Sequence, residues 1–446
     1  MPVPVMAEIF YGGLHSVPWA ASALKIAPYA AALYILRWYF SGARNSHERI
    51  MSSKVVMVTG GTSGIGESLV YSLATRGAQI ILLVKDISDP FLIDRINFLR
   101  EHTNNQLIYA EQCDLSSLHS VRLFATKWID NAPPRRLDLI LLCASHSPPP
   151  FSPQQFTHDG ADKVWGINYL ANFHLLTLLA PAIRNQPPDR DVRVITATCG
   201  SYMLSPPLAQ HIPDPALISR GGFPRSKPWQ ATGAAKLALM SFLLAFNAQN
   251  RAYIRKDKEL VNARTFIVDP GFARTPSTRS FLTLGSLWGL MVYFLTYPLW
   301  WLVLKSPKQA GESFLYAAMS PEGAEGEGGV FYRECRRGEV RRDEVYDAEL
   351  AKTLWEATEK EIVELEKKGA VERKRRKMEE EREAKKNGKK NAQDGDKGKG
   401  KGVAVGVGGA GQRIEEIIEE VEGANSGTTA SGSENLKTKA ARSRKG

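Results

Sequence analysis

Residues 55–66 read VVMVTGGTSGIG, and this stretch decides the fold. A β-branched apolar run ends in a turn rich in glycine, and a helical pattern begins directly after the turn. Glycines in that context let the backbone approach a pyrophosphate, whose charge is stabilised by the free N–H groups at the start of the helix. A glycine-rich turn without a ligand is the simpler alternative. The strand before the turn and the helix after it favour a dinucleotide-binding loop.

The same alternation of apolar run and helical pattern continues along the chain. The later runs are AQIILLV, LIYAEQCDL, LDLILLCA, VRVITA and RTFIVDP, and a last strand is expected around residues 329–332. Runs without polar alternation are typical of strands that are covered on both faces. The pattern therefore predicts an α/β fold with a doubly wound parallel sheet.

Composition limits the classes of protein that this chain can be. With 446 residues, 43% of them hydrophobic and 24% charged, it is neither a polytopic membrane protein nor disordered throughout. The net charge is +11, but residues 371–446 hold 19 Lys/Arg and 13 Asp/Glu and so carry more than half of it. The body is only mildly basic, and no pattern of stacking aromatics supports nucleic-acid binding. The four cysteines are widely spaced and indicate neither a metal site nor a disulfide framework. We therefore expect the fold to face a reducing compartment, the cytosol.

The N-terminal segment has the features of a membrane anchor. Residues 7–40 are rich in Ala, Leu, Tyr and Trp, but charges and prolines interrupt them before an uninterrupted span of about 20 apolar residues is reached. Arg37, Trp38 and Tyr39 near their end are typical of an interfacial anchor. We expect residues 1–50 to be a retained, monotopic anchor; an amphipathic helix that packs on the domain is the alternative.

A second apolar segment, residues 281–304, contains no charged residue and is called the apolar insert below. It is long enough to span a bilayer, yet it lies between two strands of one sheet, and one sheet cannot straddle a membrane. We expect a bent hairpin around Pro298 that dips into one leaflet or caps an apolar pocket, with a buried core helix as the alternative. Residues 51–340 are then one domain that contains this insert. Residues 341–446 form a charged tail, helical at first and then disordered and of low complexity.

Three motifs together resemble the short-chain dehydrogenase/reductase superfamily. They are the TG-x3-G-x-G spacing of residues 59–66, CDLSSLHSV at 113–121 and DPGFART at 269–275, and the resemblance covers residues 53–338. The chain is most similar to the membrane-associated, retinol-dehydrogenase-like branch. The resemblance implies a Rossmann fold, oxidoreductase activity and a nicotinamide cofactor. It implies a cofactor site that comprises Thr59, Gly60, Thr62, Ser63, Gly64, Ile65, Gly66, Lys85, Asp114, Leu115, Ala144, Lys236, Pro270, Gly271 and Thr275.

The end of the second apolar run predicts which cofactor is used. The run ends in Leu83-Val84-Lys85, with no acid where the 2′-hydroxyl of an NAD(H) ribose would be bound. Lys85 is instead suited to pair with a 2′-phosphate. The sequence therefore favours NADP(H) over NAD(H), and no metal is expected.

The resemblance also implies catalytic positions, and several of them are altered. Lys236 would bind the nicotinamide ribose, and Asn168 would hold the active-site water and the lysine. The tyrosine of the family's YxxxK motif is replaced by Thr232, its serine falls on Cys199, and its NNAG segment reads LCAS at 142–145. In the family the tyrosine donates a proton to the carbonyl, a task for which a threonine hydroxyl is far too weak an acid.

A substitute proton donor is therefore needed if the protein is an active enzyme. Tyr202, three residues after Cys199, is the nearby phenol, and a lining residue of the pocket is the alternative. Two functions follow. The first is an NADP(H)-dependent oxidoreductase that acts on an apolar alcohol or carbonyl, sterol-, retinoid- or fatty-acyl-like, at the cytosol-facing surface of the endoplasmic reticulum or a lipid droplet. The second is a catalytically silent cofactor-binding relative that serves as a membrane-surface scaffold or sensor.

Overall fold

The computed structural model describes residues 20–210, 223 and 226–394. Its centre is an eight-stranded sheet in the order β3-β2-β1-β4-β5-β6-β7-β8. Neighbouring strands are parallel except for β8, which runs antiparallel to β7. The strands are β1 Val55–Thr59, β2 Gln79–Val84, β3 Ile108–Gln112, β4 Leu139–Leu142, β5 Val192–Ala197, β6 Ala263–Asp269, β7 Val330–Arg333 and β8 Arg336–Gly338. The predicted doubly wound parallel sheet is confirmed, and its strand order reverses between β1 and β4.

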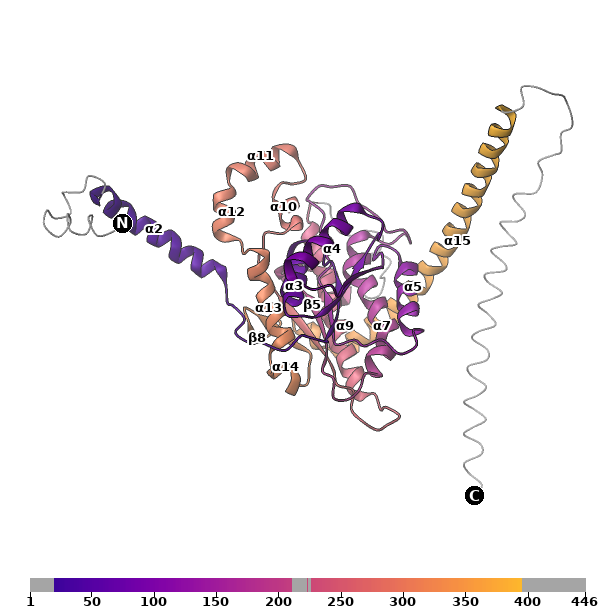
Figure 1. Ribbon diagram of the computed structural model, residues 1–446, viewed down its shortest axis with the longest axis horizontal. Helices are drawn as coiled ribbons and strands as arrows, with labels where there is room; N and C mark the ends of the chain where they lie inside the picture. The colour runs from indigo at the N-terminus through magenta and orange to yellow at the C-terminus, as the bar shows by residue number, and fades with distance from the viewer. Residues whose placement is uncertain (1–19, 211–222, 224–225, 395–446) are drawn as a thin grey trace, which may run out of the picture. The chain divides into compact units, whose positions relative to one another are not determined.

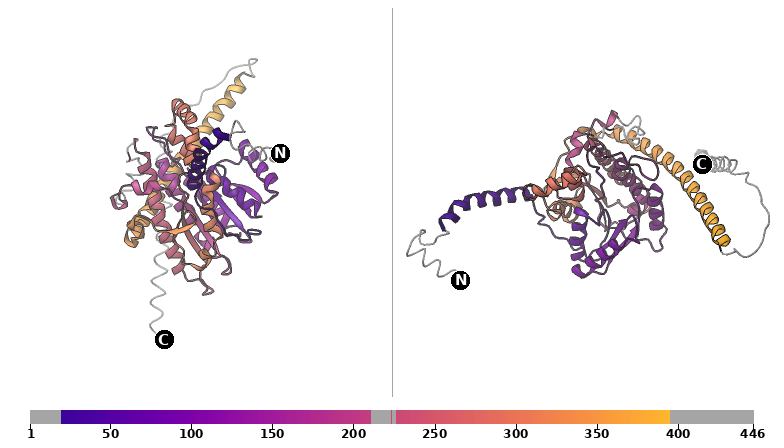
Figure 2. Two further views of the ribbon diagram at one scale, coloured as in Figure 1. Left: turned by 90° about the vertical axis from the view of Figure 1, so that its left-hand side faces the viewer. Right: turned by 90° about the horizontal axis from the view of Figure 1, so that it is seen from above.

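Helices cover both faces of the sheet (Figures 1 and 2). Alternate residues of one strand point to opposite faces, so Met57 joins one core cluster while Val56 and Val58 join the other. The first cluster includes residues of α5 Leu118–Ile129, α7 Ala171–Arg184 and α9 Pro228–Ala252. The second includes residues of α3 Gly64–Thr75, α4 Pro90–Thr103 and α13 Pro307–Met319.

Two helical segments of the described chain, Lys163–Arg184 and Pro228–Ala252, are long and apolar enough to cross a bilayer. However, 72% and 78% of their apolar windows are buried inside the protein. Their apolar character is explained by the sheet face that they cover.

The apolar insert is a bent helical hairpin. It follows α10 Pro276–Leu282 and contains α11 Leu287–Leu295 and α12 Tyr297–Val303, with the chain turning at Thr296. Trp288 and Phe294 are 78% and 79% exposed, so the alternative of a buried core helix is wrong. The bend lies two residues before Pro298, close to the predicted position.

The N-terminal segment forms helix α2, Ala20–Ser41, and residues 1–19 of the expected anchor lie outside the described chain. Tyr29, Tyr34 and Trp38 of α2 are each at least 70% exposed. Packing on the domain therefore does not account for these aromatic side chains, which remain available for another partner.

The folded unit continues past the boundary at residue 340 that the sequence suggested. Two compact units divide at Glu366, within the long helix α15 Ala348–Asp394. Leu354, Ile362 and Leu365 are buried in the first core cluster. The hydroxyls of Thr358 and Tyr169 lie 2.8 Å apart, so polar contacts also hold the first turns of α15 to the core.

Candidate active site

The glycine loop between β1 and α3 is packed against the end of β4. Gly60 has φ +66°, and a Cβ there would lie 2.7 Å from Cα of Ala144. A Cβ on Gly66 would lie 2.2 Å from the carbonyl oxygen of Gly60. The backbone N–H of Ala144 donates to Oγ1 of Thr59 at 3.3 Å. Only glycine fits these two positions, and the tight turn leads directly into α3, whose first N–H groups are the kind of site that binds a phosphate.

A cavity of about 690 Å³ opens beside this loop. It is lined by residues from the ends of β1, β2 and β3, which parallel pairing brings to one edge of the sheet. Five of the predicted cofactor residues line it together: Gly60, Thr62, Lys85, Asp114 and Leu115. The dimensions and the position at the switch of strand order suit the adenosine half of a dinucleotide.

Asp114 is held in place by its own turn. Its Oδ1 accepts hydrogen bonds from the backbone N–H and the hydroxyl of Ser116, at 2.8 and 2.7 Å. Its Oδ2 lies 3.8 Å from Nζ of Lys85, whose side chain is 71% exposed. The carboxylate therefore has a fixed direction, while the lysine is free to turn toward an added anion.

Arg95 of α4 is a second cation at this cavity that the sequence analysis missed. Its guanidinium forms an ion pair with Glu67 of α3. The helical spacing offered a signal, because Arg95 follows Phe91 and Leu92 by one turn and all three line the cavity. Lys85 and Arg95 are the two cations of this cavity, whose lining also includes the carboxylates of Asp86, Asp89 and Asp114.

The other predicted cofactor residues take different positions around the loop. Ser63 is the N-cap of α3, and its side chain makes no capping hydrogen bond. Ile65 packs against the second core cluster. A Cβ on Gly64 would lie 3.4 Å from Cγ2 of Thr275, so the segment after β6 faces the glycine loop. That segment also contains Pro270 and Gly271, whose backbone N–H donates to Oδ1 of Asp269 at 2.9 Å.

Lys236 is buried in the middle of α9. Its Nζ donates to the carbonyl oxygen of Ala197, at the end of β5, at 2.8 Å. Burial lowers the pKa of the ammonium, and the neighbouring thiols of Cys199 and Cys143 oppose that change. Burial also raises the pKa of the Cys143 thiol to about 12, so this thiol stays protonated at neutral pH.

Two aliphatic hydroxyls, one on α9 and one on the loop after β4, lie close together on the side of α9 that carries this lysine. Thr232 and Lys236 share a face of α9, and Oγ1 of Thr232 lies 3.3 Å from Oγ of Ser147. The thiol of Cys199 lies 2.9 Å from the hydroxyl of Ser201. Ser147 was missed from the sequence, because no local motif links it to a residue so far along the chain.

Asn168 holds the loop that carries Ser147. It lies in a π-helical turn, Gly166–Leu170, a distortion that is frequent at functional sites. Its side-chain amide forms two hydrogen bonds with the backbone of His146, at 2.7 and 2.8 Å. Burial lowers the pKa of His146 to about 4, with a smaller contribution from Lys163, so the imidazole is neutral at pH 7.

Tyr202 is placed in the core. It lies in the 3-10 turn Gly200–Leu204 and is 3% exposed. Its hydroxyl accepts a hydrogen bond from the backbone N–H of Arg341 at 3.4 Å. This geometry favours a packing role over the role of substitute acid, which stays a prediction.

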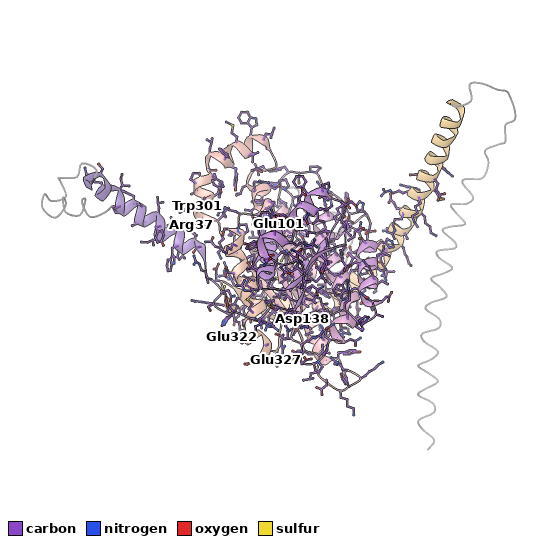
Figure 3. The ribbon with its side chains drawn as sticks, viewed as in Figure 1. Arg37, Glu101, Asp138, Trp301, Glu322 and Glu327 are labelled. Atoms are coloured by element: carbon purple, nitrogen blue, oxygen red, sulfur yellow. The ribbon has the colours of Figure 1, made fainter. Side chains whose placement is uncertain are left out.

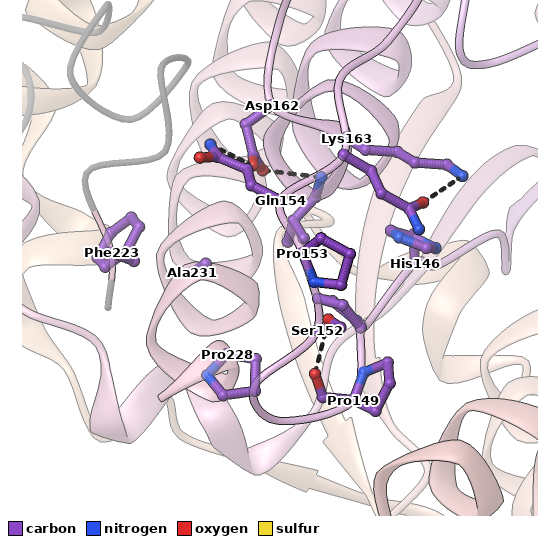
Figure 4. Close-up of a pocket in the computed structure, with 13 residues that line it drawn as sticks. His146, Pro149, Ser152, Pro153, Gln154, Asp162, Lys163, Phe223, Pro228 and Ala231 are labelled. Carbon is purple, nitrogen blue, oxygen red and sulfur yellow. Dashed lines mark hydrogen bonds between the residues drawn. The ribbon is translucent and has the colours of Figure 1, made fainter. Parts of the chain in front are cut away.

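An apolar pocket adjoins the start of α9 (Figure 4). Pro149, Pro153, Phe223, Pro228 and Ala231 are among the residues that line it, together with His146. Nearby, the rings of Trp229 and Phe281 pack edge to face with centroids 6.3 Å apart. A Cβ on Gly285 would lie 3.0 Å from Pro149. The apolar insert therefore lies beside the pocket and the Thr232–Lys236 face of α9.

Comparison with known proteins agrees with this fold. The family model described as short chain dehydrogenase matches residues 54–199. The uncharacterized oxidoreductase pbr1 of Schizosaccharomyces pombe is 42% identical over 368 residues, which cover 82% of this chain and 97% of the relative. Retinol dehydrogenase 13 of Homo sapiens is 28% identical, over 73% of this chain and 89% of that protein. Polyprenol dehydrogenase of Homo sapiens is 27% identical, over 68% and 83%.

The chain belongs to the short-chain dehydrogenase/reductase family of oxidoreductases, whose fold binds a nicotinamide cofactor. The resemblance noted in the sequence, including its retinol-dehydrogenase-like branch, is confirmed.

Proposed function

We propose that the protein is an NADP(H)-dependent oxidoreductase of an apolar alcohol or carbonyl, sterol-, retinoid- or fatty-acyl-like, at a membrane surface. The observation that carries the cofactor choice is the placement of Lys85 and Arg95 at one cavity. No acid replaces Lys85 at the end of β2, and two cations suit a 2′-phosphate better than a free ribose hydroxyl.

The residues of this chain divide the work at the reacting end. When bound, the nicotinamide supplies or accepts the hydride. Lys236 binds the ribose hydroxyls through Nζ, and Asn168 keeps the loop with Ser147 in position through its two bonds to His146. Thr232 and Ser147 donate hydrogen bonds to the substrate oxygen. They orient it, and the proton that the resulting alkoxide takes up comes from solvent water, which is slower than transfer from a phenol whose pKa is lowered by a lysine.

An apolar substrate is supported by two observations. Two relatives whose alignments cover 73% and 68% of this chain are named retinol dehydrogenase 13 and polyprenol dehydrogenase. The apolar insert lies next to the pocket at the start of α9 and carries exposed aromatic side chains. We propose that α2 and the insert enter one leaflet, on the cytosolic face of the endoplasmic reticulum or of a lipid droplet, and that substrate enters from that leaflet.

Vesicle flotation of the full chain tests the membrane contact. The double variant Trp288→Ser/Phe294→Ser should bind phosphatidylcholine vesicles at least about tenfold more weakly, since each buried aromatic contributes about 1.5 to 3 kcal/mol. The matched control is Ile254→Ser/Leu260→Ser, which removes two exposed apolar side chains from the segment between α9 and β6. Equal loss in both variants would contradict the assignment of the insert as the membrane contact.

The second candidate is a cofactor-binding relative without catalytic activity, which acts as a scaffold or sensor at the membrane. Thr232 favours it, because the structure offers hydroxyls and a thiol where the family uses a phenol and a serine. NADPH oxidation over a panel of long-chain aldehydes and ketones separates the two functions. Tight NADPH binding with no turnover of any of these substrates would support the silent relative.

A further inference from the structure

Both ends of the α10–α12 segment are tied to the loop after β6. Helix α10 begins directly after Thr275, whose Oγ1 accepts from the backbone N–H of Thr278 at 3.3 Å. At the far end, the backbone N–H of Lys305 donates to the carbonyl of Phe272 at 3.0 Å. The carbonyl of Lys305 accepts from the N–H of Arg274 at 2.9 Å. The apolar insert is therefore mounted on residues 270–275, which are called the nicotinamide loop below.

The side chain of Lys305 reaches further into this loop. It is 8% exposed, and its Nζ donates to the carbonyl oxygen of Pro270 at 3.4 Å and forms an ion pair with Glu334. A Cβ on Gly271 would lie 3.3 Å from the same nitrogen. The Lys305 side chain is 10% exposed and that of Glu334 is 38% exposed, so removing the carboxylate leaves the nearly buried ammonium without its charge partner.

Glu334 lies in the turn between β7 and β8, in an unusual backbone conformation. Its φ is +53°, in the left-handed region that favours glycine. Cys335 has φ +52°, and positive φ at both central residues is the geometry of a two-residue type I′ hairpin turn, so the turn itself requires this conformation. Oε2 of Glu334 accepts from the backbone N–H of Ala43 at 3.0 Å, two residues after α2 ends. The carboxylate thus joins Lys305 to the part of the expected membrane anchor that directly follows α2.

Helix α2 also contacts the insert directly. The guanidinium of Arg37 donates to the carbonyls of Leu302 and Leu304, both at 3.3 Å, at the end of α12. It lies 4.9 Å from the centre of the Trp301 ring (Figure 3). The two apolar elements and the nicotinamide loop therefore meet at one place, with Lys305 and Glu334 between them.

We propose that Lys305 is a positioning residue that couples membrane docking of α2 and the apolar insert to cofactor binding at the nicotinamide loop. The inference rests on the proposed function, since it needs both a membrane and a nicotinamide cofactor. Lipid contact holds the insert, and Nζ of Lys305 passes that order on through its contacts with Pro270 and Glu334, while the backbone pairing with residues 272 and 274 fixes where the side chain starts. By linkage, the factor by which vesicles strengthen NADPH binding must equal the factor by which NADPH strengthens vesicle binding.

The experiment measures both factors on the full chain. NADPH affinity is titrated with and without phosphatidylcholine vesicles, and partition into the vesicles is measured by flotation with and without saturating NADPH. Coupling between two sites is typically about 5- to 150-fold, so we expect at least a fivefold change in each measurement, and the same factor in both.

Variants at position 305 test whether the side chain of Lys305 couples vesicle binding to NADPH binding. Lys305→Met should bring both factors close to one while each ligand alone still binds, and Lys305→Arg should restore coupling. Lys308→Met is the matched control, because it removes the same charge from an exposed position three residues along the chain and should keep the wild-type factors. If Lys305→Met does not fold, Glu334→Gln takes its place and is expected to lower both factors.

Two results overturn the inference. One is independent binding of vesicles and NADPH by the wild type, and the other is coupling that persists in Lys305→Met or, where that variant does not fold, in Glu334→Gln. Absence of NADPH binding or of vesicle binding in the wild type would overturn the proposed function and this inference together. NADPH binding without vesicles and vesicle binding without NADPH are each measured alone. These two measurements distinguish a protein that does not bind one of the ligands from a protein that binds both without coupling.

Discussion

Oγ of Ser147 and Oγ1 of Thr232 lie 3.3 Å apart. Thr232 stands on α9, one helical turn before the buried Lys236. The loop after β4 and the first turns of α9 thus bring two aliphatic hydroxyls together, and the proposed function assigns them to the substrate oxygen. Hydroxyls of this kind donate hydrogen bonds but do not release a proton near neutral pH. In the proposed function the pair orients the substrate, and the source of the proton is left for experiments to test.

Restoring a phenol should raise the rate. We expect Thr232→Tyr, combined with Cys199→Ser, to increase NADPH-dependent turnover of apolar carbonyls by up to about 10² to 10⁴, the usual contribution of a positioned general acid. Thr232→Phe with the same Cys199→Ser change is the control, since it adds the ring without the hydroxyl. Equal turnover in the two double variants would show that the missing phenol does not limit the reaction.

Loss of the cation after β2 should separate the two nicotinamide cofactors. We expect Lys85→Asp to weaken NADPH binding by about 1 to 3 kcal/mol and to spare NADH, because only NADPH carries the 2′-phosphate. Arg95→Ala should act in the same direction, since both cations line one cavity. Titration calorimetry measures both affinities, and equal affinities of the wild type for NADPH and NADH would contradict the assignment.

Tyr202→Phe tests whether the buried phenol is structural or catalytic. The hydroxyl accepts one backbone hydrogen bond, from Arg341, so its removal should lower the free energy of unfolding by about 1 kcal/mol and leave turnover nearly unchanged. Thermal unfolding and NADPH oxidation are measured on the same preparation. Abolished turnover with unchanged stability would identify Tyr202 as the acid instead.

The docking of the first turns of α15 should depend on acid pH. Burial would raise the pKa of Glu366, but hydrogen bonds from His174 and Arg122 outweigh it and hold the pKa at about 2. A carboxyl whose folded-state pKa is lowered stabilises the fold fully above its usual pKa near 4.5, and the contribution is lost as the pH falls toward 2.

Glu366→Gln should therefore flatten the dependence of the melting temperature on pH between about 4.5 and 2. Glu364→Gln, at an exposed position on the same helix, should keep the wild-type profile. If the two variants had identical profiles, the carboxylate of Glu366 would not contribute to the stability of the fold at acid pH.

The strands of the sheet could be predicted from local patterns of residues. The glycine loop and the apolar runs predicted β1 to β7, since a strand covered on both faces must be apolar along its whole length. β8 was missed because Arg336-Arg337-Gly338 is polar and lies at the edge of the sheet, where burial places no demand on the sequence. The bend near Pro298 was predicted from the need to keep both flanks on one side of a membrane.

The sequence by itself determined the family, the glycine loop, Lys85 after the second strand and the position of Thr232 four residues before Lys236, because each of these features depends on residues that are close together in the chain. Only the tertiary structure decided that Ser147 meets Thr232, that Arg95 joins Lys85 at one cavity, and that Tyr202 turns into the core. It also decided that Lys305 joins the loop of residues 270–275 to Glu334. These contacts link segments far apart in the chain, and such contacts depend on how whole elements pack rather than on any local pattern of residues.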